Sequence, residues 1–327
     1  MIISQNRQFT PINIFLVTII GTVLCLGAFF HLPQELTPII LEPAVSNLIG
    51  WQPGNNLSPA ANVLVTLVLT LLQAFLLNSI VNHFNFMGKP NFLTALLFMT
   101  LVSLFLPFLV LSPTLICNFI TIWMISKLFS IYKQLDVKGL MFDLGMIVAL
   151  GSLVYFPFIV MLLLLWIALI IFRPFIWREW LTPILGFFVI YFLIGVVYYW
   201  TDRLDEFLAI FSPFANSFPT TLHVDIHDYF VAIPIVIALI CFLFVLREQY
   251  FKSIVHIRKS FQLLFCMLLL IIGSFYLNEH ININHFLLCA PPLAVYLAFY
   301  FSHAKIKWLY EGLYAVIFLT ILYFQFV

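Results

Sequence analysis

The sequence predicts an all-α, polytopic bundle of membrane-spanning helices. Of its 327 residues, 64% are hydrophobic and only 8% are charged, whereas soluble domains carry about 25% charged residues. Apolar runs close to the roughly 20 residues that cross a bilayer recur along the chain. The charges gather in the short linkers between those runs, and no linker exceeds about 30 residues. Lipid is therefore the main solvent, and we expect residues 1–327 to form a single integral membrane domain.

Eleven runs are candidates for membrane spans. Prolines separate several of them: Pro107 and Pro113 mark the turn between the third and fourth, and Pro157 separates the short fifth and sixth. Whether that short pair crosses fully stays open. The candidates cover residues 11–30, 61–82, 92–111, 113–132, 140–156, 157–173, 181–200, 229–247, 261–277, 286–302 and 308–327.

The stretch Phe172–Trp180, FRPFIWREW, marks one membrane surface. Arg173, Arg178 and Glu179 each cost roughly 2.5 to 3.5 kcal/mol at the centre of a span. The flanking tryptophans prefer the headgroup level, where the ring is in hydrocarbon and its N–H is hydrated. This stretch therefore lies at the membrane surface, in the connection between two spans.

The positive-inside rule orients the bundle. With the N-terminus inside and the C-terminus outside, 13 of the 14 Lys and Arg residues fall in inner linkers, and only Arg203 falls outside. The inner residues are Arg7, Lys89, Lys127, Lys133, Lys138, Arg173, Arg178, Arg247, Lys252, Arg258, Lys259, Lys305 and Lys307. Most acids and histidines lie on the outer side, where we expect any chemistry. The formal net charge of +1 gives no basic field for nucleic acid.

Two outer segments are long. In residues 31–60, apolar residues recur at helical spacing but are interrupted by Pro38 and Pro43, which predicts short helices in the membrane interface. Residues 201–228 begin with charges and end in the run His223–Asp228. In an extended segment His223, Asp225 and His227 share one face and suit a divalent cation. The same residues are also typical of a solvated loop, and their spacing matches no zinc signature, so we assign no metal site.

Four further outer residues are candidates. Glu35 and Glu42 lie seven residues apart, and partial burial of either carboxyl suits a general base; an exposed acid on an interfacial helix is the alternative. His31 follows the first span directly. His285 ends the connection Asn278–His285, which is either a polar hairpin or part of a cavity shared with His223–Asp228.

Few polar residues occur inside the spans. Gln73, Asn78, Asn82 and Asn118 are expected to form interhelical hydrogen bonds. The glycines in Asp143-Leu-Gly145 and Leu150-Gly-Ser152 predict close helix packing. The spans contain no continuous chain of ionisable residues, which argues against a proton-coupled carrier. The five cysteines are typical of small buried hydrophobes.

The run Phe142–Gly145, Leu150–Pro157 and Phe172–Trp180 resembles an uncharacterised family of polytopic inner-membrane proteins from the Bacteroidota. This resemblance covers nearly the whole chain and implies a bacterial inner-membrane location without an established activity.

The arrangement of a first span, a long outer loop and many short-linked spans resembles the GT-C class of membrane glycosyltransferases. The resemblance implies a polyprenyl-phosphate sugar donor and an acidic residue in the first outer loop, for which Glu35 corresponds best and Glu42 second. Where that class has a tight Asp/Glu pair, this chain has Phe29-Phe30-His31-Leu32. Arg203 is the outer cation available to a phosphate.

Three functions follow as hypotheses, and whether the chain is an enzyme stays open. The first is a non-catalytic or degenerate GT-C-like subunit of a cell-envelope process, with membrane lipids and other envelope membrane proteins as partners. The second is a glycosyltransferase acting on the periplasmic face with a polyprenyl-phosphate lipid; Glu35 and Glu42 are then catalytic candidates. Its substrate-binding candidates are His31, Arg203, His223, Asp225, His227 and His285. The third is a lipid or small-solute translocator, and no cofactor is assigned in any case.

Overall fold

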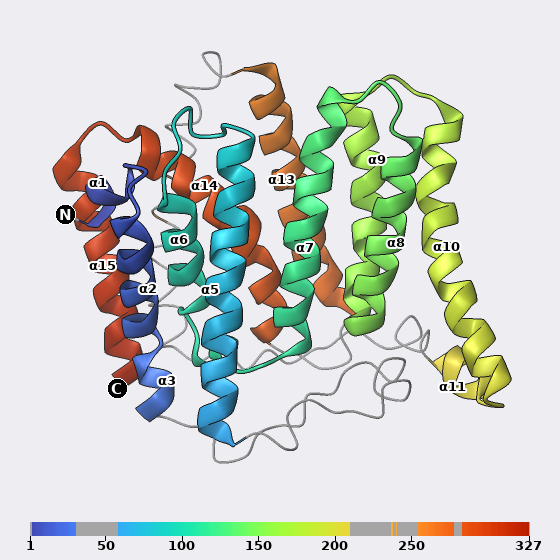
Figure 1. The fold of residues 1–327 in the computed structure, drawn as a ribbon, viewed down its shortest axis with the longest axis horizontal. Helices are drawn as coiled ribbons and strands as arrows, with labels where there is room; N and C mark the ends of the chain where they lie inside the picture. Colours follow the sequence, from blue (N-terminus) through green and yellow to red (C-terminus); the bar gives the residue numbers. More distant parts are fainter. Residues whose placement is uncertain are drawn as a thin grey trace.

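The computed structural model describes residues 2–30, 58–209, 254–277 and 283–326, together with Ile237 and Ile240. Within these residues every regular element is a helix and none is a strand, which confirms the all-α class (Figure 1). The α-helices are α1 (Ile2–Asn6), α2 (Ile12–Leu24), α3 (Leu26–Phe30), α5 (Pro59–His83), α6 (Leu93–Val102), α7 (Pro113–Ser130), α8 (Lys138–Val154), α9 (Met161–Phe172), α10 (Trp177–Trp200), α11 (Leu204–Ala209), α13 (Val255–Ser274), α14 (Ala290–His303) and α15 (Lys307–Phe326). The 3-10 helices are η1 (Leu106–Leu109), η2 (Ile131–Lys133), η3 (Phe156–Val160), η5 (Phe275–Leu277) and η6 (Ile283–Cys289).

Five described helical stretches are long and apolar enough to cross a membrane: Pro59–His83, Pro113–Ser130, Trp177–Trp200, Val255–Leu277 and Ile283–His303. Shorter apolar stretches cover Ile12–Leu24, Leu93–Val102 and Phe156–Phe172. The predicted spans 140–156 and 157–173 correspond to α8 and to η3 with α9, which meet at Tyr155. Most of the predicted span 229–247 lies outside the described residues.

Consecutive long helices run in opposite directions, so their connections alternate between two ends of the bundle (Figure 1). The α5–α6, α7–α8, α9–α10 and α14–α15 connections lie at the top in Figure 1, and the α10–α11 turn lies at the bottom. A contact of 3.1 Å between His256 Nε2 and the carbonyl oxygen of Phe129 joins the start of α13 to the end of α7.

We call the end with the α7–α8 and α9–α10 connections the cationic end. Of the 12 Lys and Arg residues in the described part of the chain, 11 lie in its connections or in the adjoining helix turns, and Arg203 lies at the opposite end. The 11 are Arg7, Lys89, Lys127, Lys133, Lys138, Arg173, Arg178, Arg258, Lys259, Lys305 and Lys307.

Serine–proline pairs start two of the long helices. The Ser58 hydroxyl accepts the backbone N–H of Ala61 at 3.3 Å, and the Ser112 hydroxyl accepts that of Leu115 at the same distance. Pro59 and Pro113 take the first helical position, where the missing N–H has no intrahelical partner to lose. The predicted turn around Pro107 and Pro113 is confirmed as η1 followed by the start of α7.

Glycine brings α8 and α10 into backbone contact. A methyl group added at Gly145 would overlap the carbonyl oxygen of Pro183, and one added at Gly186 would overlap that of Phe142. Pro183 has no N–H for the carbonyl of Glu179, four residues earlier; the Thr182 hydroxyl donates to that carbonyl instead, at 2.9 Å. The predicted close packing at Gly145 is therefore confirmed: Gly145 packs on the backbone of Pro183, and Gly186 on α10 packs on that of Phe142.

The centre of the bundle is α14. Of the most apolar residues of the stretch Ile283–His303, 83% are buried within the protein, against 22% of those of α10. α14 packs against α6 and α13, and the Tyr296 hydroxyl donates to the carbonyl of Phe261 on α13 at 2.8 Å. α10 is thus a peripheral helix with most of its surface facing away from the protein.

The N-terminal segment is fixed to the C-terminal hairpin. Arg7 donates to the carbonyl oxygens of Phe301 and Ala304 at 2.8 Å each, and its guanidinium lies 4.2 Å from the centroid of the Tyr310 ring. Carbonyls at the C-terminus of a helix favour such a cation. The Glu311 carboxylate accepts the backbone N–H of Ser4 at 2.8 Å and the Ser4 hydroxyl at 2.7 Å.

We predict that Gly145→Ala lowers the free energy of unfolding by about 1 to 3 kcal/mol, because the added methyl group forces α8 and α10 apart. Thermal unfolding of the full chain in detergent measures the change. Gly139→Ala is the matched control, since it lies on the same helix and a methyl group there meets nothing within 4 Å. Equal melting temperatures for Gly145→Ala and the wild type would contradict the packing argument.

Candidate functional site

Two of the eight predicted site residues belong to the described part of the chain, Arg203 and His285. The structure therefore tests where these two lie and what surrounds them. The other six lie outside the described residues: His31, Glu35, Glu42, His223, Asp225 and His227.

His285 is fully buried, at 0% exposure, at the end of the bundle opposite the cationic end. Its Nε2 atom lies 2.7 Å from the carbonyl oxygen of Ile271 on α13, and its Nδ1 atom lies 2.7 Å from the hydroxyl of Tyr155. The Ser274 hydroxyl lies 3.4 Å from Nε2 and donates to the same carbonyl. One imidazole therefore joins η6, α13 and the junction between α8 and η3.

The partners of His285 define its tautomer. A carbonyl oxygen only accepts hydrogen bonds, so Nε2 carries the proton that is donated to Ile271. In the neutral ring Nδ1 then accepts the hydroxyl proton of Tyr155. The sequence placed His285 in a connection between spans and did not identify Tyr155 or Ser274, which are 130 and 11 residues away. Both ring nitrogens are used within the fold.

Two amides predicted to join helices do so. Gln73 on α5 donates to the carbonyl of Leu115 on α7 at 2.7 Å, and Asn118 on α7 donates to that of Leu287 in η6 at 3.2 Å. The amide oxygens Gln73 Oε1 and Asn118 Oδ1 are buried without a hydrogen-bond partner in the described part of the protein. The same holds for Asn78 Oδ1, so the predicted interhelical bond of Asn78 is not found there.

Arg203 lies in the exposed turn between α10 and α11. Asp202 adopts a φ of 55°, a left-handed conformation that Asp tolerates better than most residues. This reversal lets the backbone N–H of Arg203 donate to the carbonyl of Tyr198 at 3.0 Å. α11 consequently folds back along the last turns of α10, and it places Arg203 beside Leu204.

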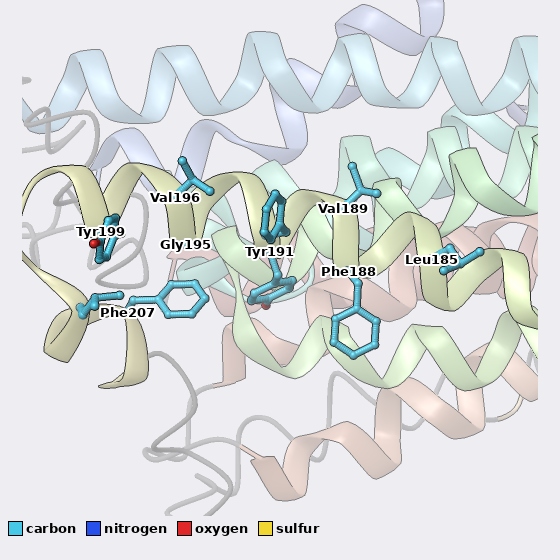
Figure 2. A pocket seen from close by; sticks show the side chains of 10 residues that line it. Leu185, Phe188, Val189, Tyr191, Gly195, Val196, Tyr199 and Phe207 are labelled. Carbon is cyan, nitrogen blue, oxygen red and sulfur yellow. The ribbon is translucent and has the colours of Figure 1, made fainter.

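α10 and α11 together form an apolar groove of about 760 Å³. Figure 2 shows the ring of Phe207 on α11 opposite Gly195 of α10, and Tyr191 farther along the same helix. The Tyr191 hydroxyl contacts that of Ser152 on α8 at 2.9 Å and so turns away from the groove. The lining residues are Leu185, Phe188, Val189, Tyr191, Phe192, Gly195, Val196, Tyr199, Leu204 and Phe207.

At the cationic end, Arg173 holds two connections together. Its guanidinium donates to the carbonyls of Gln134 and Leu135 at 2.7 and 2.8 Å. Its Nε atom lies 3.3 Å from a carboxylate oxygen of Glu179, close enough for an ion pair but not aligned as a hydrogen bond. Glu179 is only 3% exposed, so the segment predicted to mark the membrane surface contains a buried carboxylate that requires this cation.

Two further ion pairs lie at the same end. Lys127 and Asp143 are 2.9 Å apart, and Lys138 and Asp136 are 3.2 Å apart. The pKa of the Asp136 carboxyl is lowered, first because it accepts the backbone N–H of Lys138 and then because it accepts the ammonium of that residue. These exposed pairs orient the α7–α8 connection and contribute little stability.

The described residues contain no group of three or more His, Cys, Asp or Glu side chains arranged to hold a metal ion. Among the described residues, Cys25, Cys117, Cys266 and Cys289 form no disulfide; Cys25, Cys117 and Cys289 are buried, as predicted for small hydrophobes, and Cys241 lies outside the described residues.

Comparisons with known proteins give one match. Residues 48–327, which are 280 of the 327 residues, match the model of a family of unknown function, DUF6427. No curated protein and no solved structure matches the chain. The match covers well over half of the chain, and the chain therefore belongs to this family.

Proposed function

We propose that the chain is a multi-pass protein of the bacterial inner membrane that acts as a non-catalytic, GT-C-like subunit of a cell-envelope process. The observation that carries this proposal is that His285 forms hydrogen bonds within the protein through its side chain. Both of its ring nitrogens bind groups of the fold, so the one predicted site residue in the described interior connects helices. Gln73 and Asn118 also connect helices through their amide donors.

The distribution of cations supports the orientation. Lys and Arg residues accumulate in cytoplasmic connections of inner-membrane proteins. The cationic end holds 11 of the 12 described Lys and Arg residues. We therefore place this end in the cytosol, and we place the α10–α11 turn and the His285 cluster toward the periplasm.

A polyprenyl-phosphate-dependent glycosyltransferase is the alternative. Two points favour it. Arg203 lies beside an apolar groove at the proposed periplasmic end, and Glu35 is expected on the same side of the membrane. A lipid or small-solute translocator is a second alternative, supported by the unpaired amide oxygens Gln73 Oε1 and Asn118 Oδ1 inside the bundle. Neutral polar atoms of this kind bind water or a neutral solute more readily than a charged one.

The orientation is tested by cysteine labelling in a variant whose native cysteines are replaced by alanine. Leu135 and Thr201 are exposed at opposite ends of the bundle. We expect a membrane-impermeant maleimide to label Thr201→Cys in intact cells and Leu135→Cys only after the membrane is permeabilised. The reverse pattern would place the cationic end in the periplasm and reject the proposed orientation.

The structural role of His285 is tested through its hydroxyl partner. Tyr155→Phe leaves the buried Nδ1 atom without its donor, and we expect the free energy of unfolding to fall by about 1 to 3 kcal/mol. Tyr199→Phe is the control, because the Tyr199 side chain is 68% exposed and should melt as the wild type does. Wild-type stability for Tyr155→Phe, combined with loss of cellular function, would favour a substrate-binding role for the cluster.

Catalysis is tested by complementation of a deletion strain. A non-catalytic subunit predicts that Glu35→Gln and Arg203→Ala restore growth and incorporation of labelled sugar into surface glycan to wild-type levels. Protein abundance in the membrane fraction is the control for each variant. Loss of a catalytic acid or base lowers a reaction rate by about 100-fold or more. If both variants accumulate normally but reduce glycan synthesis by that factor, the transferase alternative holds.

A further inference from the structure

We propose that buried water molecules bind between α5 and α7, in a site formed by the side-chain oxygens of Thr66, Gln73, Asn118 and Thr121. This inference goes beyond the subunit role and does not depend on it. It rests on two polar stripes that meet inside the bundle and on two amides whose orientation is fixed by the fold. In the described part of the chain, all four oxygens are buried without a hydrogen-bond partner.

Each of the two helices carries a stripe of buried polar residues. α5 and α7 lie side by side (Figure 1). On α5, Thr66, Thr70 and Gln73 are separated by four and three residues and so share one face of the helix. On α7, Asn118 and Thr121 are three residues apart and also share a face. Each of these five residues is at most 1% exposed, so lipid reaches none of them.

The hydrogen bonds of the two amides define which atom remains unpaired. Gln73 Nε2 lies 2.7 Å from the carbonyl oxygen of Leu115, and Asn118 Nδ2 lies 3.2 Å from that of Leu287. A carbonyl oxygen only accepts hydrogen bonds, so each amide directs its NH₂ group to that carbonyl. The atoms left over, Gln73 Oε1 and Asn118 Oδ1, are both acceptors and require a donor.

The two acceptors belong to neighbouring side chains. Gln73 meets α7 at Leu115, and Asn118 lies on the next turn of that helix. Side chains three residues apart on a helix have Cβ atoms about 5 to 6 Å apart. A water molecule donates two hydrogen bonds, so one molecule can join both amide oxygens. The hydroxyls of Thr66 and Thr121 extend the site along the two helices.

The chemistry of the site favours water over an ion. All four oxygens are neutral, α5 contains no Asp, Glu, Lys or Arg, and the one such residue on α7, Lys127, is paired with Asp143 at 2.9 Å. A cation would therefore be buried without a compensating negative charge. A buried water molecule typically makes about three hydrogen bonds to polar groups that otherwise lack partners, and these oxygens are groups of that kind.

An experimental density map of the full chain in lipid nanodiscs, at a resolution that shows ordered water, tests the proposal. We expect water density within hydrogen-bond distance of both Gln73 Oε1 and Asn118 Oδ1. A site with no density there would overturn the proposal. Density for a larger solute, or for a side chain from residues 31–57 or 210–253, would assign the donor to another group and would also overturn it.

Two threonine variants separate the water site from general helix packing. Thr66 and Thr70 are one turn apart and fully buried, but the Thr70 hydroxyl donates to the carbonyl of Leu67 at 2.9 Å. We expect Thr66→Val to remove water density beside position 66 and to lower the melting temperature. Thr70→Val is the control and should keep the water density of the wild type.

The sign of the stability change is informative, because replacing an unpaired buried hydroxyl by a methyl group is neutral or stabilising. An unchanged or higher melting temperature for Thr66→Val would therefore indicate a dry site and reject the proposal. Gln73→Met is a second variant, which removes an amide acceptor at similar side-chain length. We expect it to lose the bridging water. Water density that persists unchanged in folded Gln73→Met would contradict the assignment of this oxygen.

Discussion

The exclusion of unpaired polar groups from hydrocarbon governs the whole structure. Hydrocarbon offers no hydrogen bonds, so a polar group in a span is stabilised where the protein supplies a partner or where the group lies at a surface. Among the described residues, the amide oxygens of Gln73, Asn78 and Asn118 are exceptions. The charges follow this constraint most strictly: Arg173 and Glu179 pair at the cationic end, and Arg7 binds the last carbonyls of α14. Neutral amides and His285 occupy the interior because their partners are available on neighbouring helices.

The same constraint explains what could be predicted from the sequence. A charge in a span is so unfavourable that the position of Arg173 or Lys138 alone indicates a membrane surface, whatever lies around it. Helix starts are also local, because Ser58 and Ser112 cap through a residue only three positions away. The all-α class and several helix limits were therefore predictable without knowledge of contacts.

The candidate site was much less predictable, because its contacts join distant segments. His285 was expected in a polar hairpin, but its burial depends on Tyr155 and Ile271, which only the packing of α8 and α13 brings together. The burial of Glu179 requires the cation of Arg173 six residues earlier in a specific turn. Close packing at Gly145 was predictable from the residue itself, whereas the backbone that it meets, at Pro183 on α10, was not.

The backbone contacts at Gly145 and at Gly186 also have a consequence for the opposite side of α10. Because the backbones meet at these glycines, α10 is attached along a narrow stripe and keeps most of its surface outside the protein. Tyr191 extends that attachment through its bond to Ser152, and α11 folds back over the end of the helix. The groove lies between α10 and α11, because α8 packs on one side of α10 and α11 folds back along another side. The position of the groove is therefore a result of how α8 and α11 contact α10.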